Sequence, residues 1–154
     1  MLIQPCTLVS PWSRHPKNEK NYPYWNNLMF GLAVRGWRLI QVGVDGESKL
    51  DGCEYKFNLE LVLLEKLLLD VGHFIACDNF LHHMAYSLGI EGVVLFGPSD
   101  PVIFGYPTQL NILKSRDYLR KDQFGFYKDY VWEHSREGWY EAEEVIRQIC
   151  GEYS

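Results

Sequence analysis

Short groups of apolar residues recur along this chain, and they alternate between continuous runs and helical spacing. Mostly continuous apolar runs, which are typical of buried strands, fall at 6–10, 38–43, 53–57, 73–77, 92–96 and 108–113. Apolar residues at helical spacing fall at 23–35, 59–70, 80–88 and 136–150. Strands and helices that alternate in this way indicate a parallel sheet with helices on both faces. The pattern therefore predicts a three-layer α/β fold with a mostly parallel sheet.

Two of the predicted helices have recognisable starts. Asn58 is the expected N-cap of the second helix, because its side chain can accept a hydrogen bond from a free N–H group. We expect that helix, with its apolar run Leu59–Leu69, to be amphipathic and buried. In the last helix, which follows Ser135, the apolar residues are spaced to make one face: Trp139, Val145, Ile146 and Ile149.

Polar turns follow two neighbouring predicted strands. Asp78 and Asn79 come directly after 73–77, and the turn 97–101, with Ser99 and Asp100, follows 92–96. Open α/β sheets bind ligands beside the carboxyl ends of their strands. These turns are therefore where we expect the chemistry of the protein to be.

Composition narrows the class of protein. The chain has 154 residues, 47% of them hydrophobic, and a net charge of −5. This length suits one domain over 1–154, and the negative charge argues against general binding to nucleic acid or a membrane surface. No apolar run approaches the roughly 20 residues of a membrane span. The start lacks a basic leader and a long apolar core, so we expect a cytoplasmic protein.

The sequence contains few motifs that are typical of a metal site. Its four cysteines, Cys6, Cys53, Cys77 and Cys150, are widely spaced and form no C-x-x-C motif. We expect reduced and mostly buried thiols, no metal site and no cofactor. No D-x-D pair suggests a metal–diphosphate clamp either.

The order of residues from 78 to 101 resembles a family motif. Asp78, Asn79, His83 and Ala85 lead into Leu88-Gly89, and an apolar run ends in the turn 96–101, Phe-Gly-Pro-Ser-Asp-Pro. This stretch resembles the carboxyl-terminal half of glycosyltransferase family 9, the ADP-heptose:lipopolysaccharide heptosyltransferases. The family pattern is roughly D-[ST]-G-x-x-H-x-A-x-x-L-G followed by F-G-x-[ST]-x-P.

The amino-terminal third is similar to the same half of the family. A strand ending in Val9 leads into a small-residue turn, 10–14, and the segment 19–23, Glu-Lys-Asn-Tyr-Pro, resembles the family's K-x-W-P. A helix and a second strand ending at Gly43 follow, with Glu47 near the family's glutamate. The resemblance covers about 3–104. It implies a Rossmann-like domain equivalent to one half of a GT-B glycosyltransferase.

The resemblance also implies substrate-binding residues, each of which has an ordinary structural alternative. Lys20 would contact donor phosphates, or it is a solvated lysine in a charged loop. Ser10, Ser13 and Arg14 would hold phosphate, or they form a simple loop. Glu47 would bond ribose hydroxyls. The remaining candidates would contact donor sugar or phosphate: Asp78, Asn79, His83, Ser99 and Asp100. For Asp78 and Asn79 this role is compatible with capping the helix, whereas the alternative for His83 is a core histidine and for the other two a turn.

Some residues depart from the family pattern or have two readings. Phe80 stands where the family has glycine, and its ring would partly fill the space in which a helix start approaches a phosphate. His82 does not match the motif. The aromatic residues near the first turn could stack on a base, although core packing is the alternative: Trp12, Tyr22, Tyr24 and Trp25.

The implied function is binding of a nucleotide-diphosphate sugar, with an ADP-sugar favoured. Hexosyl or heptosyl transfer would be inverting and independent of metal. The family's general base lies in the half that this chain does not resemble, so the catalytic residues are unknown and transfer would require a partner chain or a homodimer mate. We expect the aromatic stretch 104–134 to form such a homodimer contact. The alternatives are a non-catalytic nucleotide-binding or interaction protein, and a different small enzyme on the same fold, such as a nucleotide-sugar hydrolase.

Overall fold

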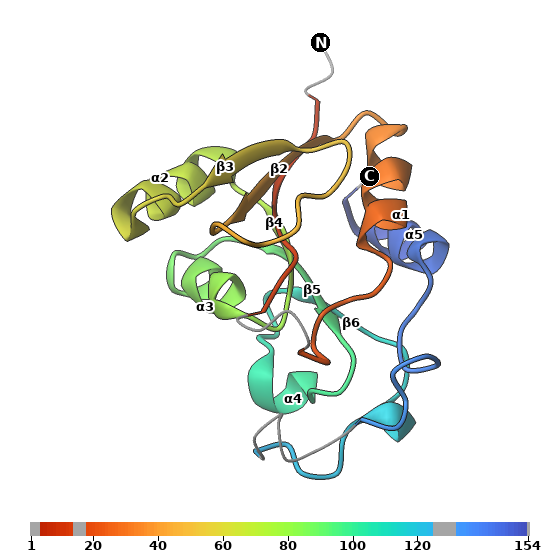
Figure 1. The fold of residues 1–154 in the computed structure, drawn as a ribbon. Coiled ribbons are helices and arrows are strands. Elements are labelled where there is room, and N and C mark those ends of the chain that lie inside the picture. The colour runs from red at the N-terminus through yellow and green to blue at the C-terminus, as the bar shows by residue number, and fades with distance from the viewer. Residues whose placement is uncertain (1–3, 14–17, 125–131, 154) are drawn as a thin grey trace.

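The computed structural model describes residues 4–13, 18–124 and 132–153. Within them, all six strands join one parallel sheet in the order β3-β2-β1-β4-β5-β6 (Figure 1). The bounds are β1 Cys6–Ser10, β2 Arg38–Gly43, β3 Glu54–Phe57, β4 Phe74–Cys77, β5 Gly92–Phe96 and β6 Leu110–Leu113. The predicted α/β fold with a parallel sheet is confirmed.

Helices cover both faces of the sheet. On one side lie α1 (Trp25–Ala33) and α5 (Ala142–Tyr153), and on the other α2 (Leu61–Val71) and α3 (Phe80–Ser87) (Figure 1). The short α4 (Pro101–Phe104) and the 3-10 turn η1 (Arg116–Tyr118) lie beyond the carboxyl ends of the strands. Sequence periodicity did not predict these two, because each is too short to show a period.

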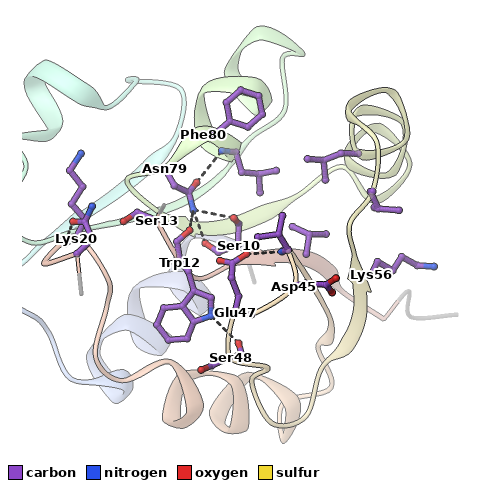
Figure 2. Close-up of a pocket in the computed structure, with 18 of the residues that line it drawn as sticks. Ser10, Trp12, Ser13, Lys20, Asp45, Glu47, Ser48, Lys56, Asn79 and Phe80 are labelled. Atoms are coloured by element: carbon purple, nitrogen blue, oxygen red, sulfur yellow. Dashed lines mark hydrogen bonds between the residues drawn. The ribbon is translucent and has the colours of Figure 1, made fainter. Parts of the chain in front are cut away.

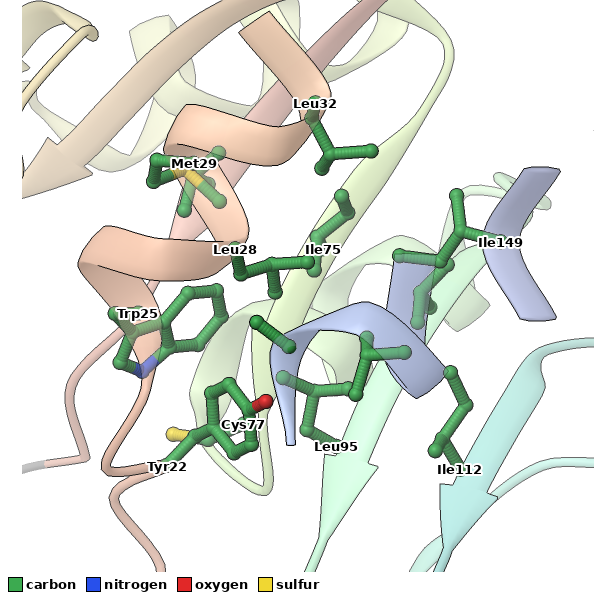
Figure 3. Close-up of a cluster of buried hydrophobic side chains, with 14 of the residues drawn as sticks. Tyr22, Trp25, Leu28, Met29, Leu32, Ile75, Cys77, Leu95, Ile112 and Ile149 are labelled. Atoms are coloured by element: carbon green, nitrogen blue, oxygen red, sulfur yellow. The ribbon is translucent and has the colours of Figure 1, made fainter. Parts of the chain in front are cut away.

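The core on the α1–α5 face is built from alternate residues of the strands. Val9, Ile75 and Leu95 point to this face and pack against Leu28 of α1 and Ile149 of α5 (Figure 3). The two helices approach closely at Gly31, where a β-carbon would collide with the side chain of Ile146. The aromatic residues Tyr22 and Trp25 belong to this core and meet edge to face, so core packing is the reading that holds for them.

The opposite face is covered less completely. Leu8, Ala76 and Val94 pack there with Leu81 of α3 and Leu68 of α2. Leu68 is the buried residue of α2, whereas its other apolar side chains include four that are exposed: Leu61, Val62, Leu63 and Leu69. The prediction that this helix is buried is therefore wrong for most of its length. The charged residues Glu65, Lys66 and Asp70 mark only one side of this helix, and the pattern does not tell which of the many apolar residues will face the sheet.

The strand order explains where a ligand site should lie. The chain builds β1, β2 and β3 outward in one direction and then returns to place β4 on the other side of β1. Leu8 of β1 consequently pairs with Ile40 of β2 and with Phe74 of β4. Connections leave the carboxyl ends of β1 and β4 in opposite directions, which opens a crevice between them.

Two predicted helix starts are wrong. Asn58 is not the N-cap of α2; it adopts a left-handed conformation (φ 60°) and exchanges hydrogen bonds with Asp45, while Glu60 precedes the helix. The last helix begins at Ala142 and not near 136. Trp139 precedes it in a turn where Gly138 passes so close to the Trp132 ring that a β-carbon would collide with it. Trp139 is buried as predicted, without being helical.

The cysteines and the membrane prediction have clear outcomes. All four cysteines are free thiols, as expected, but only Cys77 is buried and the other three are partly exposed. Among the described residues, no helix has the length and apolar character needed to span a bilayer.

Candidate functional site

A cavity of about 880 Å³ opens at the carboxyl edge of the sheet. Its walls come from the loop after β1, the loop after β2, the end of β3, and the β4–α3 turn (Figure 2). Of the predicted site residues with described positions, six line it: Ser10, Ser13, Lys20, Glu47, Asp78 and Asn79. Arg14 lies outside the described residues. The cavity occupies the crevice between β1 and β4 that the strand order creates.

Asn79 connects the two sides of this crevice. Its Nδ2 donates to the backbone oxygen and the Oγ of Ser10, both at 3.0 Å, and to Trp12 O at 3.3 Å. Its Oδ1 accepts from the backbone N of Leu81 at 3.0 Å and so caps α3. Both polar atoms of the amide are therefore used in holding the β1 loop against the helix start. Asn79 therefore caps α3 and also lines the cavity, and its contact with a substrate stays a prediction.

The loop after β2 forms the second wall. Gln41 holds it by accepting from Leu50 N and donating to Ser48 O, and Trp12 Nε1 donates to the same oxygen at 2.9 Å. Trp12 therefore borders the cavity, unlike the core aromatic residues Tyr22 and Trp25. Glu47 Oε1 accepts from Val44 N at 2.7 Å, which fixes one carboxylate oxygen in the loop.

A charged cluster stands at the end of the cavity near β4. Lys20 Nζ lies 3.1 Å from Asp78 Oδ2, and His82 Nε2 lies 2.9 Å from Asp78 Oδ1. Asp78 is buried. Burial raises the pKa of its carboxyl group, but the hydrogen bond from His82 and the charge of Lys20 outweigh burial and bring the pKa below its usual value. Asp78 is therefore an ionised carboxylate that holds a lysine ammonium at the cavity wall.

The histidine that contacts Asp78 is not the one the motif indicated. His82 makes this contact because it lies four residues after Asp78, whereas His83 turns away and its Nδ1 meets the Tyr106 hydroxyl at 2.6 Å. His83 does not line the cavity. Burial, and then the neighbouring His82, lower the pKa of His83. The histidine whose geometry can orient Asp78 is therefore His82.

Ser99 and Asp100 also lie away from the cavity. Asp100 caps α4 by accepting from Val102 N and forms a bidentate ion pair with Arg116 at 2.9 and 2.7 Å. Gln123 accepts from Asp100 N and donates to Pro98 O. This turn therefore fixes the segment 115–124 against the end of β5. Because Asp100 does not line the cavity, unlike Asp78, the structural alternative is the better interpretation of Asp100.

Phe80 stands at the rim of the cavity. Its side chain is 60% exposed, and the ring points away from Ser10 and Glu47 (Figure 2). The ring therefore borders the opening and does not fill the space in front of the helix start.

Three possible metal ligands come together in the described residues. Donor atoms of Asp78, His82 and His83 lie within 4.8 Å of one another. The Lys20 ammonium already balances the charge of Asp78, and a cation at this carboxylate would have to compete with it. We therefore interpret the cluster as a hydrogen-bonded ion pair.

Comparisons with known proteins address the fold. No protein-family model and no curated protein sequence matches this chain. Solved structures do match. One is the iron-containing dodecameric glycosyltransferase TibC from enterotoxigenic E. coli H10407, which matches at 17% identity with a TM-score of 0.72 and covers 100% of this chain and 47% of its own. A family 9 glycosyl transferase from Veillonella parvula DSM 2008 matches at 17% identity with a TM-score of 0.70, covering 95% of this chain and 45% of that one.

A third solved structure with the same fold is E. coli heptosyltransferase WaaC with ADP. It matches at 16% identity with a TM-score of 0.64, covering 96% of this chain and 43% of WaaC. This chain thus spans about half the length of the structures it matches. It has the α/β fold of one half of a GT-B glycosyltransferase, as the motifs predicted.

Proposed function

We propose that this chain binds a nucleotide-diphosphate sugar and serves as the donor-binding half of a glycosyltransferase. The observation that carries the proposal is the Lys20–Asp78 ion pair at the wall of the cavity between β1 and β4. An ammonium group there is suited to diphosphate oxygens, which accept charge-assisted hydrogen bonds. The carboxylate beside it is suited to sugar hydroxyls, because it accepts hydrogen bonds from them, whereas its negative charge repels a phosphate. ADP is the favoured nucleotide, because two proteins with this fold were crystallised with ADP and with ADP-D-β-D-heptose.

The rest of the cavity suits the nucleoside. One oxygen of Glu47 is fixed by the backbone, and we assign the other to a ribose hydroxyl. Beyond Glu47 the wall becomes apolar, with Val42, Leu59 and Leu64. Such a surface fits the faces of a base, which lose contact with water on binding. The order phosphate, ribose, base would then run from Lys20 toward α2.

In transfer, Lys20 would stabilise the charge that develops on the leaving diphosphate. A second half, in a partner chain, a homodimer mate or a further part of the same protein, would supply the general base for the acceptor hydroxyl. The chain described here would therefore bind the donor and hold its leaving group.

Calorimetric titration with ADP tests this function. The wild-type protein should bind ADP, and AMP more weakly, because AMP lacks one of the phosphates that face Lys20. Lys20→Gln should weaken ADP binding by about tenfold, since it removes a charge-assisted contact. Lys66→Gln is the matched control: Lys66 is exposed on α2 and does not line the cavity, so its loss should leave the affinity unchanged.

Two results would contradict the proposal. The first is no binding of ADP, UDP or GDP at millimolar concentration by the wild-type protein. The second is equal affinity for ADP in the Lys20→Gln and Lys66→Gln variants, which would place the nucleotide elsewhere.

A further inference from the structure

His82 is a fully buried ionisable side chain that lies next to the charged cluster of the cavity. Its ring is 0% exposed and lies edge to face with Phe96 of β5. The backbone oxygen of His82 accepts from Gln109 Nε2 at 3.0 Å, and Gln109 is itself buried. The imidazole is thus held from behind by the sheet, while its Nε2 faces Asp78 at 2.9 Å.

The surroundings of the ring decide which nitrogen carries the hydrogen. Nδ1 of His82 is buried and has no hydrogen-bond partner among the described residues. A hydrogen on Nδ1 would be a buried donor without an acceptor, which is costly, whereas a hydrogen on Nε2 is donated to the Asp78 carboxylate. The favoured arrangement therefore has the hydrogen on Nε2, which donates it to Asp78.

This donor fixes one oxygen of Asp78 and leaves the other for Lys20. The two oxygens are used separately: Oδ1 by His82 and Oδ2 by the Lys20 ammonium at 3.1 Å. Without the donor at Oδ1, the carboxylate would lose a partner in a buried place and would be free to rotate toward Lys20. The position of the ammonium at the cavity wall therefore depends on His82, which does not itself line the cavity.

We propose that His82 is a positioning residue, which donates a hydrogen bond from Nε2 to Asp78 and thereby holds the Lys20 ammonium at the cavity wall. Its contribution to nucleotide binding rests on the function proposed above. The hydrogen-bond relay itself does not, because it consists entirely of side chains of this chain.

The first test measures the tautomer in the wild-type protein. Long-range ¹H–¹⁵N spectra at pH 7 should show the His82 hydrogen on Nε2 and an unprotonated Nδ1. A neutral ring with its hydrogen on Nδ1 would overturn the proposal. So would one zinc or iron ion per chain that survives dialysis and is lost in His82→Gln, because the cluster would then be a metal site.

The second test replaces His82 by glutamine or by asparagine, whose side-chain amides differ in length. The side-chain nitrogen of His82→Gln stands near the place of Nε2, whereas that of His82→Asn stands near Nδ1 and cannot reach Asp78. The ¹H–¹⁵N signal of the Lys20 ammonium should remain observable in wild type and in the Gln variant, and broaden through faster solvent exchange in the Asn variant. An unchanged signal in a folded Asn variant would overturn the proposal.

ADP titration of the same variants adds the functional arm. The Gln variant should bind ADP within about threefold of wild type, and the Asn variant about tenfold more weakly. A purely structural role would lower the thermal midpoint of both variants without separating their affinities, and that result would overturn the proposal. If wild type binds no nucleotide, the proposed function fails, while the tautomer and the Lys20 signal still decide the role of His82.

Discussion

His73 lies at the end of the sheet opposite the cavity, immediately before β4. Its Nδ1 lies 2.9 Å from Thr7 Oγ1, its Nε2 is buried without a hydrogen-bond partner in the described part of the chain, and Tyr153 packs edge to face on the ring. Burial lowers the pKa of His73 from 6.5 to about 4. A protonated ring would leave a buried charge without a partner, so this histidine is neutral in the folded protein.

We predict that His73 makes the protein less stable as the pH falls from about 6.5 toward 4. In this window the unfolded chain binds a proton at His73 and the folded protein does not, which favours unfolding. The loss should be about 2 kcal/mol at pH 5 relative to pH 7. His73→Asn keeps the donor toward Thr7 but cannot titrate, so urea unfolding should show a smaller difference between the two pH values. An equal difference in both proteins would contradict this prediction.

A second prediction concerns the two roles of Asn79. Asn79→Ala removes the cap of α3 and the link to Ser10, and should lower the free energy of unfolding by about 2 kcal/mol. Asn79→Ser keeps an oxygen that can cap the helix but loses the amide donor, so it should recover about half of that loss. Because both variants lack the donor to Ser10, equal stability of the two in urea would show that the cap of α3 contributes nothing.

The sequence indicated the residues of the site better than their roles. Asp78 and Lys20 meet at the cavity, but no one-dimensional pattern shows that they form an ion pair from distant segments. The family motif does not indicate His82, although its spacing of four from Asp78 is a signal that two side chains share a helix face. The ion pair of Asp100 could not be predicted, because its partner, Arg116, comes from a segment with no recognisable pattern.

At the scale of elements, α2 offers a direct comparison. Leu68 and Leu69 are neighbours on this helix, but Leu68 is 0% exposed and Leu69 is 56% exposed. Leu68→Ala should lower the free energy of unfolding by about 2–5 kcal/mol because it leaves a cavity between the helix and the sheet. Leu69→Ala should change it by less than about 0.5 kcal/mol. Similar losses in chemical denaturation would mean that Leu69 is covered in solution.

The strands were easier to predict than the helix ends. Buried parallel strands are apolar on both faces, so β1, β2 and β5 match the predicted ranges at both ends. Helix starts depend on which residue caps the backbone. Asn58 has a suitable side chain for α2, yet it bonds to Asp45 in the loop after β2. That choice is set by a contact between segments and is absent from the local sequence.

At the scale of the whole molecule, the proposed function predicts the activity of the isolated chain. It should bind ADP and transfer no sugar, because residues 4–13, 18–124 and 132–153 place no general base where an acceptor hydroxyl would meet the donor in the proposed arrangement. Incubation with an ADP-sugar and an acceptor should release no ADP on chromatography. Rapid release of ADP with formation of a glycosylated acceptor would show that this chain is complete for catalysis.

The homodimer stays a prediction. Within the aromatic stretch 104–134, the structure places Phe124 at the surface, where its ring lies 5.8 Å from that of Phe104. Residues 125–131 of this stretch lie outside the described residues. Light scattering should show a dimer at high protein concentration, and Phe124→Ser should shift the equilibrium toward monomer. A wild-type monomer at every concentration would contradict the prediction.

The central position of β1 also bears on how the protein folds. Leu8 pairs with Ile40, which follows it closely in the sequence, whereas its other neighbour, Phe74, comes only after β3 and α2 in the sequence. Contacts between such distant segments slow folding, since a long loop must close before they contribute. Until β4 arrives, β1 carries an open edge with unpaired backbone groups, to which a strand of another molecule can bind. Refolding at high dilution should therefore give the best yield, because the returning β4 then has no competitor.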